Sequence, residues 1–248
     1  MLTELPTWLE AECFDKNGHR RHEWVRKYDG RYWFLKTSRK ELLAYNLGRR
    51  FVNIAEVRLS PTEISANAED VIILLSQCHN QAELPIQDLD EAVAAEFAFS
   101  LLIKRRDLHA FNRAYVNGLP VFFDCASAFP EAEADCSLDN FFQSTNSDID
   151  LLDWKVWSPD ENFSVDTINS RTSWQNGCKG LIVNNEETFK EKLVSKIQHF
   201  SSLSSSDIQE SIQESGIHGN QAKQISECLK ISQDQLSLLT SNIFGIEI

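Results

Sequence analysis

The sequence has 248 residues, of which 42% are hydrophobic and 25% charged, so it is long enough to bury a substantial core. Its formal net charge of −13 argues against general nucleic-acid binding through a basic surface. Residues 1–60 hold 12 Lys and Arg against 8 Asp and Glu, and the remainder holds 12 against 29. A mildly basic first quarter beside an acidic remainder suits an anionic ligand at their junction, or reflects a simple drift of surface charge.

Cysteine spacing and hydropathy predict a cytoplasmic chain without a membrane span. The six cysteines are scattered and form no CxxC pair, which fits a reducing compartment and buried thiols better than a disulfide framework or a zinc site. The N-terminus shows no basic region followed by an apolar run, so no signal peptide is expected. The longest apolar stretch, around Ala92 to Ile103, is interrupted by Glu96 and falls short of the roughly 18 residues that a membrane span needs. The oligomeric state stays open.

The first elements in chain order are three antiparallel strands. Apolar and polar residues alternate over Glu12–Lys16, His22–Tyr28 and Arg31–Lys36. The pairs Asn17-Gly18 and Asp29-Gly30 between them are typical of tight hairpin turns.

One helix and two further strands follow. Ser38, with Glu41 three residues later, predicts a helix start with a capping box. Asn53–Leu59 is predicted to be a strand, and the apolar run Val71–Leu75 a buried one. The polar stretch from Ser76 to Pro85 then predicts a connection between two lobes.

Beyond that connection the pattern is mainly helical. A buried helix is predicted over Leu89–Lys104, and a hairpin that turns at Asn117-Gly118 and ends in Asp124 follows it. Further helices are expected over Glu186–Phe200, Asp207–Glu214, Asn220–Lys230 and Gln233–Leu239. The predicted fold class is therefore α+β: a small antiparallel β lobe with one helix over residues 1–77, and a mainly helical lobe over residues 78–248.

The region between the buried helix and the end of the hairpin carries an acid, an amide and a second acid. Phosphoryl transfer from a magnesium nucleotide uses one carboxylate to orient the attacking hydroxyl, and an amide oxygen and a second carboxylate to hold the metal. Asp107, Asn112 and Asp124 supply these groups in that order. Each also has a plain structural interpretation, as a loop aspartate, a turn asparagine and a strand-ending aspartate respectively.

Two motifs in this region carry a resemblance to a known superfamily. Asp107-Leu108-His109-Ala110-Phe111-Asn112 matches D-x-H-x-x-N, the catalytic loop of phosphoinositide kinases, HipA-type kinases and aminoglycoside phosphotransferases. The residues from Asp124 to Pro130 are similar to the D-x-G-x-A-F metal-binding stretch of the phosphoinositide 4-kinase and HipA-like branches, with Ala126 in place of the usual glycine. The chain thus resembles the atypical branches of the protein-kinase-like superfamily, which implies a bilobal fold.

The resemblance implies ATP and Mg²⁺ as cofactors and a role for each site residue. It assigns the catalytic base to Asp107, support of the loop to His109, and metal ligation to Asn112 and Asp124. It assigns the phosphate contact to Lys36, pairing with that lysine to Glu41, and the adenine contacts to the segment Leu75–His79, with Leu75 and Gln77 as candidates. No Gly-rich loop precedes Lys36.

Several residues have competing interpretations. The capping box is a sufficient reason for Glu41, and His109 is as compatible with a purely structural role. Arg105 and Arg106 bind an anionic substrate or, more simply, solvate the end of a helix, where the macrodipole favours cations.

The predicted function is an ATP- and Mg²⁺-dependent kinase whose acceptor is a hydroxyl, with protein serine or threonine favoured through the HipA-like branch. A phosphoinositide or a small molecule is the alternative acceptor. A nucleotide-binding pseudokinase that acts as an interaction module is the alternative from another functional class, and transfer of a nucleotidyl group is a third.

Overall fold

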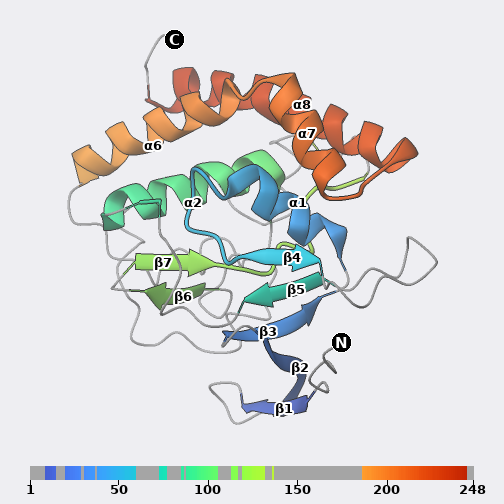
Figure 1. Ribbon diagram of the computed structural model, residues 1–248. Helices are drawn as coiled ribbons and strands as arrows, with labels where there is room; N and C mark the ends of the chain where they lie inside the picture. The colour runs from blue at the N-terminus through green and yellow to red at the C-terminus, as the bar shows by residue number, and fades with distance from the viewer. Residues whose placement is uncertain are drawn as a thin grey trace.

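The structure is a computed structural model of the 248-residue chain (Figure 1). It describes residues 9–14, 20–28, 31–36, 38–59, 73–76, 85–86, 88–105, 113–116, 119–131, 136 and 186–244. Side chains are described for residues 38–59, 85–86, 88–105, 119–131, 136 and 188–238. The remaining strands and helix ends are described by their backbone.

Five strands form one antiparallel sheet in the order β1-β2-β3-β5-β4 (lower half of Figure 1). They span Leu9–Phe14 (β1), Arg20–Tyr28 (β2), Arg31–Lys36 (β3), Val57–Leu59 (β4) and Ile73–Ser76 (β5). β5 lies between β3 and β4, so Lys36 at the end of β3 is opposite Ile73, and Leu75 is opposite both Phe34 and Val57.

Helix α1 (Arg39–Gly48) joins the sheet to the helical part of the molecule. Its residues Leu43, Ala44 and Leu47 are buried in the main core. The absence of a side chain at Gly48 permits a close approach to α2, because a Cβ there would lie 2.8 Å from Cζ of Phe99.

Helix α2 (Leu89–Ile103) is the centre of the core. The side chain of Asp88 caps it by accepting a hydrogen bond from the Glu91 amide at 2.9 Å, and 13 of its 15 residues are buried. Helix α6 (Glu186–Ser201) packs along it through a row of fully buried side chains at helical spacing, namely Phe189, Leu193, Ile197 and Phe200. Figure 1 shows these helices on one side of the strands.

Two further helices complete the helical layer. Helix α7 (Ser205–Glu214) contacts α1, and helix α8 (Gly219–Phe244) contacts α2 and α6. The chain between α7 and α8 turns at Gly216, which has a φ of +65°.

A hairpin of β6 (Arg113–Val116) and β7 (Leu119–Phe122) follows α2. β7 is fixed to the segment before β4: the amide of Phe122 donates to the carbonyl of Asn53 at 3.0 Å, and the amide of Ala55 donates to the carbonyl of Phe122 at 2.9 Å. This pairing brings the end of β7 beside the segment that follows α1.

These elements confirm the α+β class and most of the predicted helices and strands, with four corrections. β1 overlaps the predicted strand Glu12–Lys16 but begins three residues earlier and ends two residues earlier, at Phe14. β4 covers only the end of the predicted Asn53–Leu59, because Asn53 and Ile54 pair with Phe122 instead. Ser38 precedes α1 as predicted, but its side chain makes no cap hydrogen bond, so the capping box is not formed.

The fourth correction is that α8 is one continuous helix where two were predicted. Ser232, at the expected break, keeps helical geometry, and its hydroxyl donates to the carbonyl of Cys228 one turn earlier at 2.9 Å. The division of the chain into two lobes at about residue 77 stays a prediction.

The cysteine prediction holds in one respect and fails in another. Cys125 is a buried free thiol, as expected. Cys136 and Cys228, however, form a disulfide across a sequence separation of 92 residues. A pairing between positions so far apart depends on tertiary contacts that spacing in the sequence does not reveal. In the described part of the chain, no helix is both long enough and apolar enough to cross a membrane.

Candidate functional site

The structure describes the predicted site residues to different extents. Asp107, His109, Asn112 and Gln77 lie outside the described residues, so their predicted roles stay predictions. Lys36 and Leu75 are described by their backbone only. Asp124 and Glu41 are described fully, and they define the part of the site that can be examined in atomic detail.

Asp124 lies two residues beyond the end of β7 and adopts a left-handed backbone conformation, with a φ of +62°. A left-handed non-glycine residue is uncommon and costs backbone free energy, although aspartate tolerates it better than most. Such conformations persist where the surroundings impose them, and they occur often at functional sites. The side chain is half-buried.

Arg105 supplies much of that surrounding structure. Its Nη2 donates to the carbonyl of Phe123 at 2.7 Å, and its Nε donates to the carbonyl of Asp124 at 3.4 Å. The guanidinium also lies 4.7 Å from the centre of the Phe122 ring. One side chain therefore contacts three consecutive residues at the end of the hairpin.

The opposite side of the guanidinium pairs with α2. Arg105 Nη1 lies 3.2 Å from Oε1 of Glu96, and both side chains are almost fully buried, at 0% and 4% exposure. The sequence-based interpretation that Arg105 solvates a helix end is therefore wrong. The end of α2 is buried, and the arginine faces the hairpin instead of solvent.

Glu41 on α1 is also buried, with 2% of its surface exposed. The charge of Glu41 acts on the thiol of Cys125, the residue that follows Asp124. The pKa of the Cys125 thiol is raised to about 12, chiefly by burial, and the charges of Arg105, Glu41, Asp124 and Glu96 all act on it. The charges of three carboxylates and one guanidinium therefore all influence the protonation of this thiol, although burial is the largest cause of the raised pKa.

The stretch after Asp124 is fixed to three helices, α2, α1 and α8. The amide of Phe129 donates to the carbonyl of Ile103 at the end of α2, at 2.8 Å. Glu131 then forms an ion pair with Lys40 of α1 at 3.3 Å and accepts a hydrogen bond from Gln221 of α8 at 3.4 Å.

Arg105 and Glu96 are the residues of this site whose arrangement the sequence did not predict. The available signal was Glu96 itself, because a carboxylate inside a run of apolar helical residues is rarely buried without a partner. That signal calls for a buried cation nearby, and the nearest basic residues along the chain are Lys104, Arg105 and Arg106.

The donor chemistry near Asp124 fits a hard cation. A carboxylate oxygen is the type of ligand that Mg²⁺ prefers, and Mg²⁺ keeps several waters when only one or two protein carboxylates and substrate phosphates hold it. Within the described ranges, no group of three or more His, Cys, Asp or Glu side chains could hold a metal alone. Asp124 would therefore share the ion with a ligand and with residues outside these ranges.

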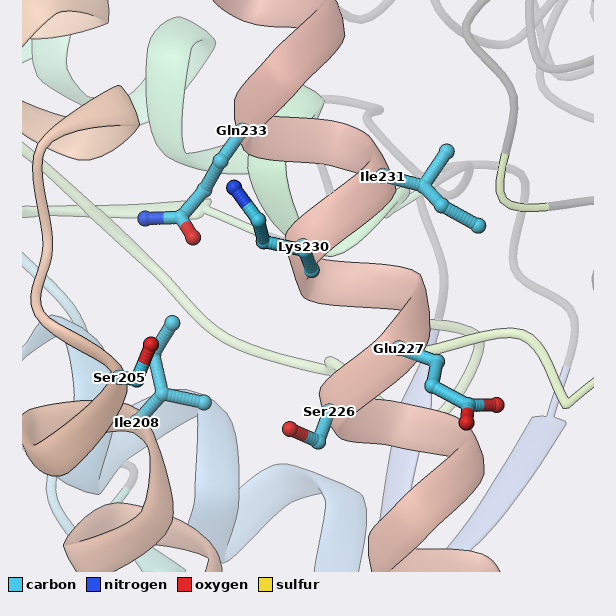
Figure 2. Close-up of a pocket in the computed structure, with 7 residues that line it drawn as sticks. All are labelled: Ser205, Ile208, Ser226, Glu227, Lys230, Ile231 and Gln233. Carbon is cyan, nitrogen blue, oxygen red and sulfur yellow. The ribbon is translucent and has the colours of Figure 1, made fainter.

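A separate groove of about 570 Å³ lies between α7 and α8. Figure 2 shows Ser205 and Ile208 of α7 on one side of it and Lys230 and Gln233 of α8 on the other. Neither Asp124 nor Glu41, the two predicted site residues whose side chains are described, lines this groove. Its buried polar residue, Gln233, already donates to the carbonyl of Phe200 in α6 and to that of Leu203 in the loop after α6.

Comparison with known proteins finds little. No protein-family model matches the chain, and no curated protein matches it. Among solved structures, the chain is similar to the crystal structure of CtkA, a proinflammatory kinase of Helicobacter pylori. The TM-score is 0.47, the identity is 12%, and 92% of each chain is covered. This likeness to a kinase is coarse and assigns no role to individual residues.

Proposed function

We propose that this protein is a phosphotransferase that uses ATP and Mg²⁺ to phosphorylate a hydroxyl group. Asp124 and Asn112 would hold the metal, and Lys36, paired with Glu41, would contact the phosphates. Asp107 would orient the attacking hydroxyl and accept its proton, with His109 supporting the loop. The metal would neutralise the charge of the phosphates, and the protein would hold the nucleotide and the attacking hydroxyl in position.

The observation that carries the proposal is the arrangement of Asp124. It follows the hairpin in a left-handed conformation, and its main-chain carbonyl accepts a hydrogen bond from the fully buried side chain of Arg105. Phosphoryl transfer requires an acidic metal ligand whose position is fixed beforehand.

The path of the backbone adds support. In protein kinases the phosphate-binding lysine lies on the third strand and pairs with a glutamate on the helix that follows. Here Lys36 is the last residue of β3, and Glu41 lies in the first turn of α1, which begins three residues later. Ser38 makes no side-chain cap hydrogen bond, so the reciprocal capping box is not formed at the start of α1.

A protein serine or threonine is the acceptor that we favour, because the D-x-H-x-x-N loop and the stretch from Asp124 to Pro130 resemble the HipA-like branch. A phosphoinositide or a small alcohol is the alternative. Adenine would contact the segment from Leu75 to His79, with Leu75 and Gln77 as the candidate residues, since Leu75 lies on β5 next to β3.

The test is transfer of γ-labelled phosphate from ATP by the purified protein in the presence of Mg²⁺. We expect labelling of the protein itself or of a protein in a lysate. Asp124→Asn should abolish transfer while the protein stays folded, because asparagine tolerates the left-handed backbone and lacks the charge. Asp107→Asn should reduce turnover and leave nucleotide affinity nearly unchanged.

The alternatives give distinct results in the same assay. Nucleotide binding without transfer would identify a pseudokinase, and label from α-labelled ATP alone would identify nucleotidyl transfer. A wild-type protein that neither transfers phosphate nor gains thermal stability with nucleotide would overturn the proposal.

A further inference from the structure

A buried ion pair beside Asp124 requires a physical reason, because it is costly to form. Glu96 lies within a helix whose neighbouring residues are apolar and buried. Desolvating a carboxylate and a guanidinium can cost more than their mutual attraction returns, and apolar residues of similar volume are often equally stable. The pair between Glu96 and Arg105 is therefore weak evidence for a role in stability.

The geometry of the pair indicates a different role. Glu96 binds one edge of the guanidinium, at Nη1, and this leaves Nη2 and Nε directed at the carbonyls of Phe123 and Asp124. The ring of Phe122 lies against the guanidinium as well. A planar, forked donor is suited to fixing several acceptors at once, which a lysine cannot do.

These hydrogen bonds hold the backbone at Phe123 and Asp124, where the chain adopts an unfavourable conformation. Asp124 is in a left-handed conformation, and the direction of its side chain depends on its backbone angles. A relaxation of φ toward the usual negative range would swing the carboxylate away from its present position.

We propose that Arg105, held by Glu96, is a positioning residue that fixes the backbone of Asp124 and so presents its carboxylate to the metal of a metal–nucleotide complex. This inference rests on the proposed function. It assigns Arg105 no contact with substrate: the arginine acts through Asp124, in the way that residues around a metal ligand orient that ligand.

The neighbouring residue offers a matched control. Lys104 is also a fully buried cation at the end of α2, but its Nζ contacts the carbonyl of Leu101 and the hydroxyl of Ser232 on α8. Lys104→Met therefore replaces a neighbouring buried basic side chain whose hydrogen bonds go to α2 and α8 and not to Phe123 or Asp124.

The experiment measures binding of Mn²⁺, as a spectroscopic substitute for Mg²⁺, to the full-length protein with a non-hydrolysable ATP analogue, by electron paramagnetic resonance. Nucleotide affinity without metal is measured in parallel. Arg105→Lys and Glu96→Gln should weaken Mn²⁺ binding about 10- to 100-fold, the usual effect of losing a residue that orients a metal ligand. Both variants should keep the metal-free affinity for nucleotide, and Lys104→Met should match the wild type in both measurements.

The outcomes separate this inference from the proposed function. Folded Arg105→Lys and Glu96→Gln variants that bind Mn²⁺ as tightly as the wild type would overturn the positioning role and leave the proposed function standing. A wild-type protein that binds no Mn²⁺–nucleotide complex would overturn both. If Arg105→Lys fails to fold, Glu96→Gln decides the question, because glutamine keeps the size of the side chain but removes the charge that holds the guanidinium.

Discussion

At the scale of single residues, two consecutive buried cations behave differently. Arg105 pairs with the carboxylate of Glu96. In the described part of the chain, Nζ of Lys104 instead contacts two neutral oxygens: the carbonyl of Leu101 at 3.1 Å and the hydroxyl of Ser232 at 2.5 Å. Burial lowers the pKa of Lys104 from 10.5 to about 7. A large fraction of the molecules therefore carry a neutral lysine at this position near neutral pH.

This predicts a pH dependence of stability that can be traced to one residue. Between pH 7 and about 10.5 the unfolded chain holds a proton that the folded protein has released, so the free energy of unfolding should rise with pH across that interval. Lys104→Met should remove this contribution and flatten the rise. Urea denaturation of both proteins at several pH values measures it.

The comparison depends on the difference between the two proteins, because all other titrating groups are common to both. That difference in unfolding free energy should change steadily between pH 7 and 10. A difference that stays constant over the range would show that Lys104 keeps its ordinary pKa in the folded protein.

Residue-level prediction from the sequence succeeded where the chemistry was local and failed where it was not. Asp124 was predicted as a strand-ending residue from the apolar strand before it and the turn at Asn117-Gly118, and it follows β7 as expected. Arg105 was assigned to solvent because its partners, the carbonyls of Phe123 and Asp124, are 18 and 19 residues away. Every residue has a main-chain carbonyl, so the sequence does not show which carbonyls will accept hydrogen bonds from a distant side chain.

At the scale of elements, helix α1 is held by hydrogen bonds to residues at the end of α7, far along the chain. The guanidinium of Arg39 donates to the carbonyls of Ser215 and Gly216 at the end of α7, at 3.2 and 2.9 Å. Asn46 donates to the hydroxyl of Ser215 at 3.0 Å. The start of α1 thus caps α7, because cations near a helix C-terminus satisfy its free carbonyls.

Gly216→Ala is predicted to break this junction. The glycine has a φ of +65°, and an added Cβ would collide with the guanidinium of Arg39. The variant should lose about 1–2 kcal/mol from the left-handed backbone alone and more from the displaced arginine. Urea denaturation gives the total loss in unfolding free energy.

Gly219→Ala is the matched control for this change. Gly219 has nearly the same φ, +61°, but a Cβ there meets nothing within 4 Å, so only the backbone cost applies. In a background of Arg39→Ala, the two substitutions should cost the same amount. Equal costs in the wild-type background as well would refute a coupling between α1 and α7.

The helices and most of their ends were predictable from periodicity, but the contacts that fix those ends were not. The prediction of α1 used Ser38 and Glu41, and the helix does begin after Ser38, although through a main-chain hydrogen bond from the Glu41 amide to the Ser38 carbonyl. The role of Arg39 could not be predicted, because its acceptors lie 176 and 177 positions further along the chain.

At the scale of the whole molecule, contacts between distant segments surround the stretch after Asp124. Glu131 connects it to Lys40 of α1 and Gln221 of α8, and Cys136 connects it to α8 through the disulfide with Cys228. The order of strands and helices predicted the α+β class correctly. It could not predict these connections, since each depends on how α1 and α8, far apart in the sequence, pack beside Glu131 and Cys136.

The disulfide gives the prediction that belongs to this scale. A cross-link that closes a loop of this length restricts the unfolded chain, and removing a native disulfide typically costs about 2–5 kcal/mol. Reduction of the wild-type protein and the double substitution Cys136→Ser, Cys228→Ser should therefore lower the urea midpoint to a similar degree.

The double variant should then be insensitive to reductant, whereas Cys125→Ser, which removes the buried free thiol, should keep the sensitivity of the wild type. Titration of all six cysteines as free thiols in denaturant without reductant would show instead that the purified protein holds no disulfide.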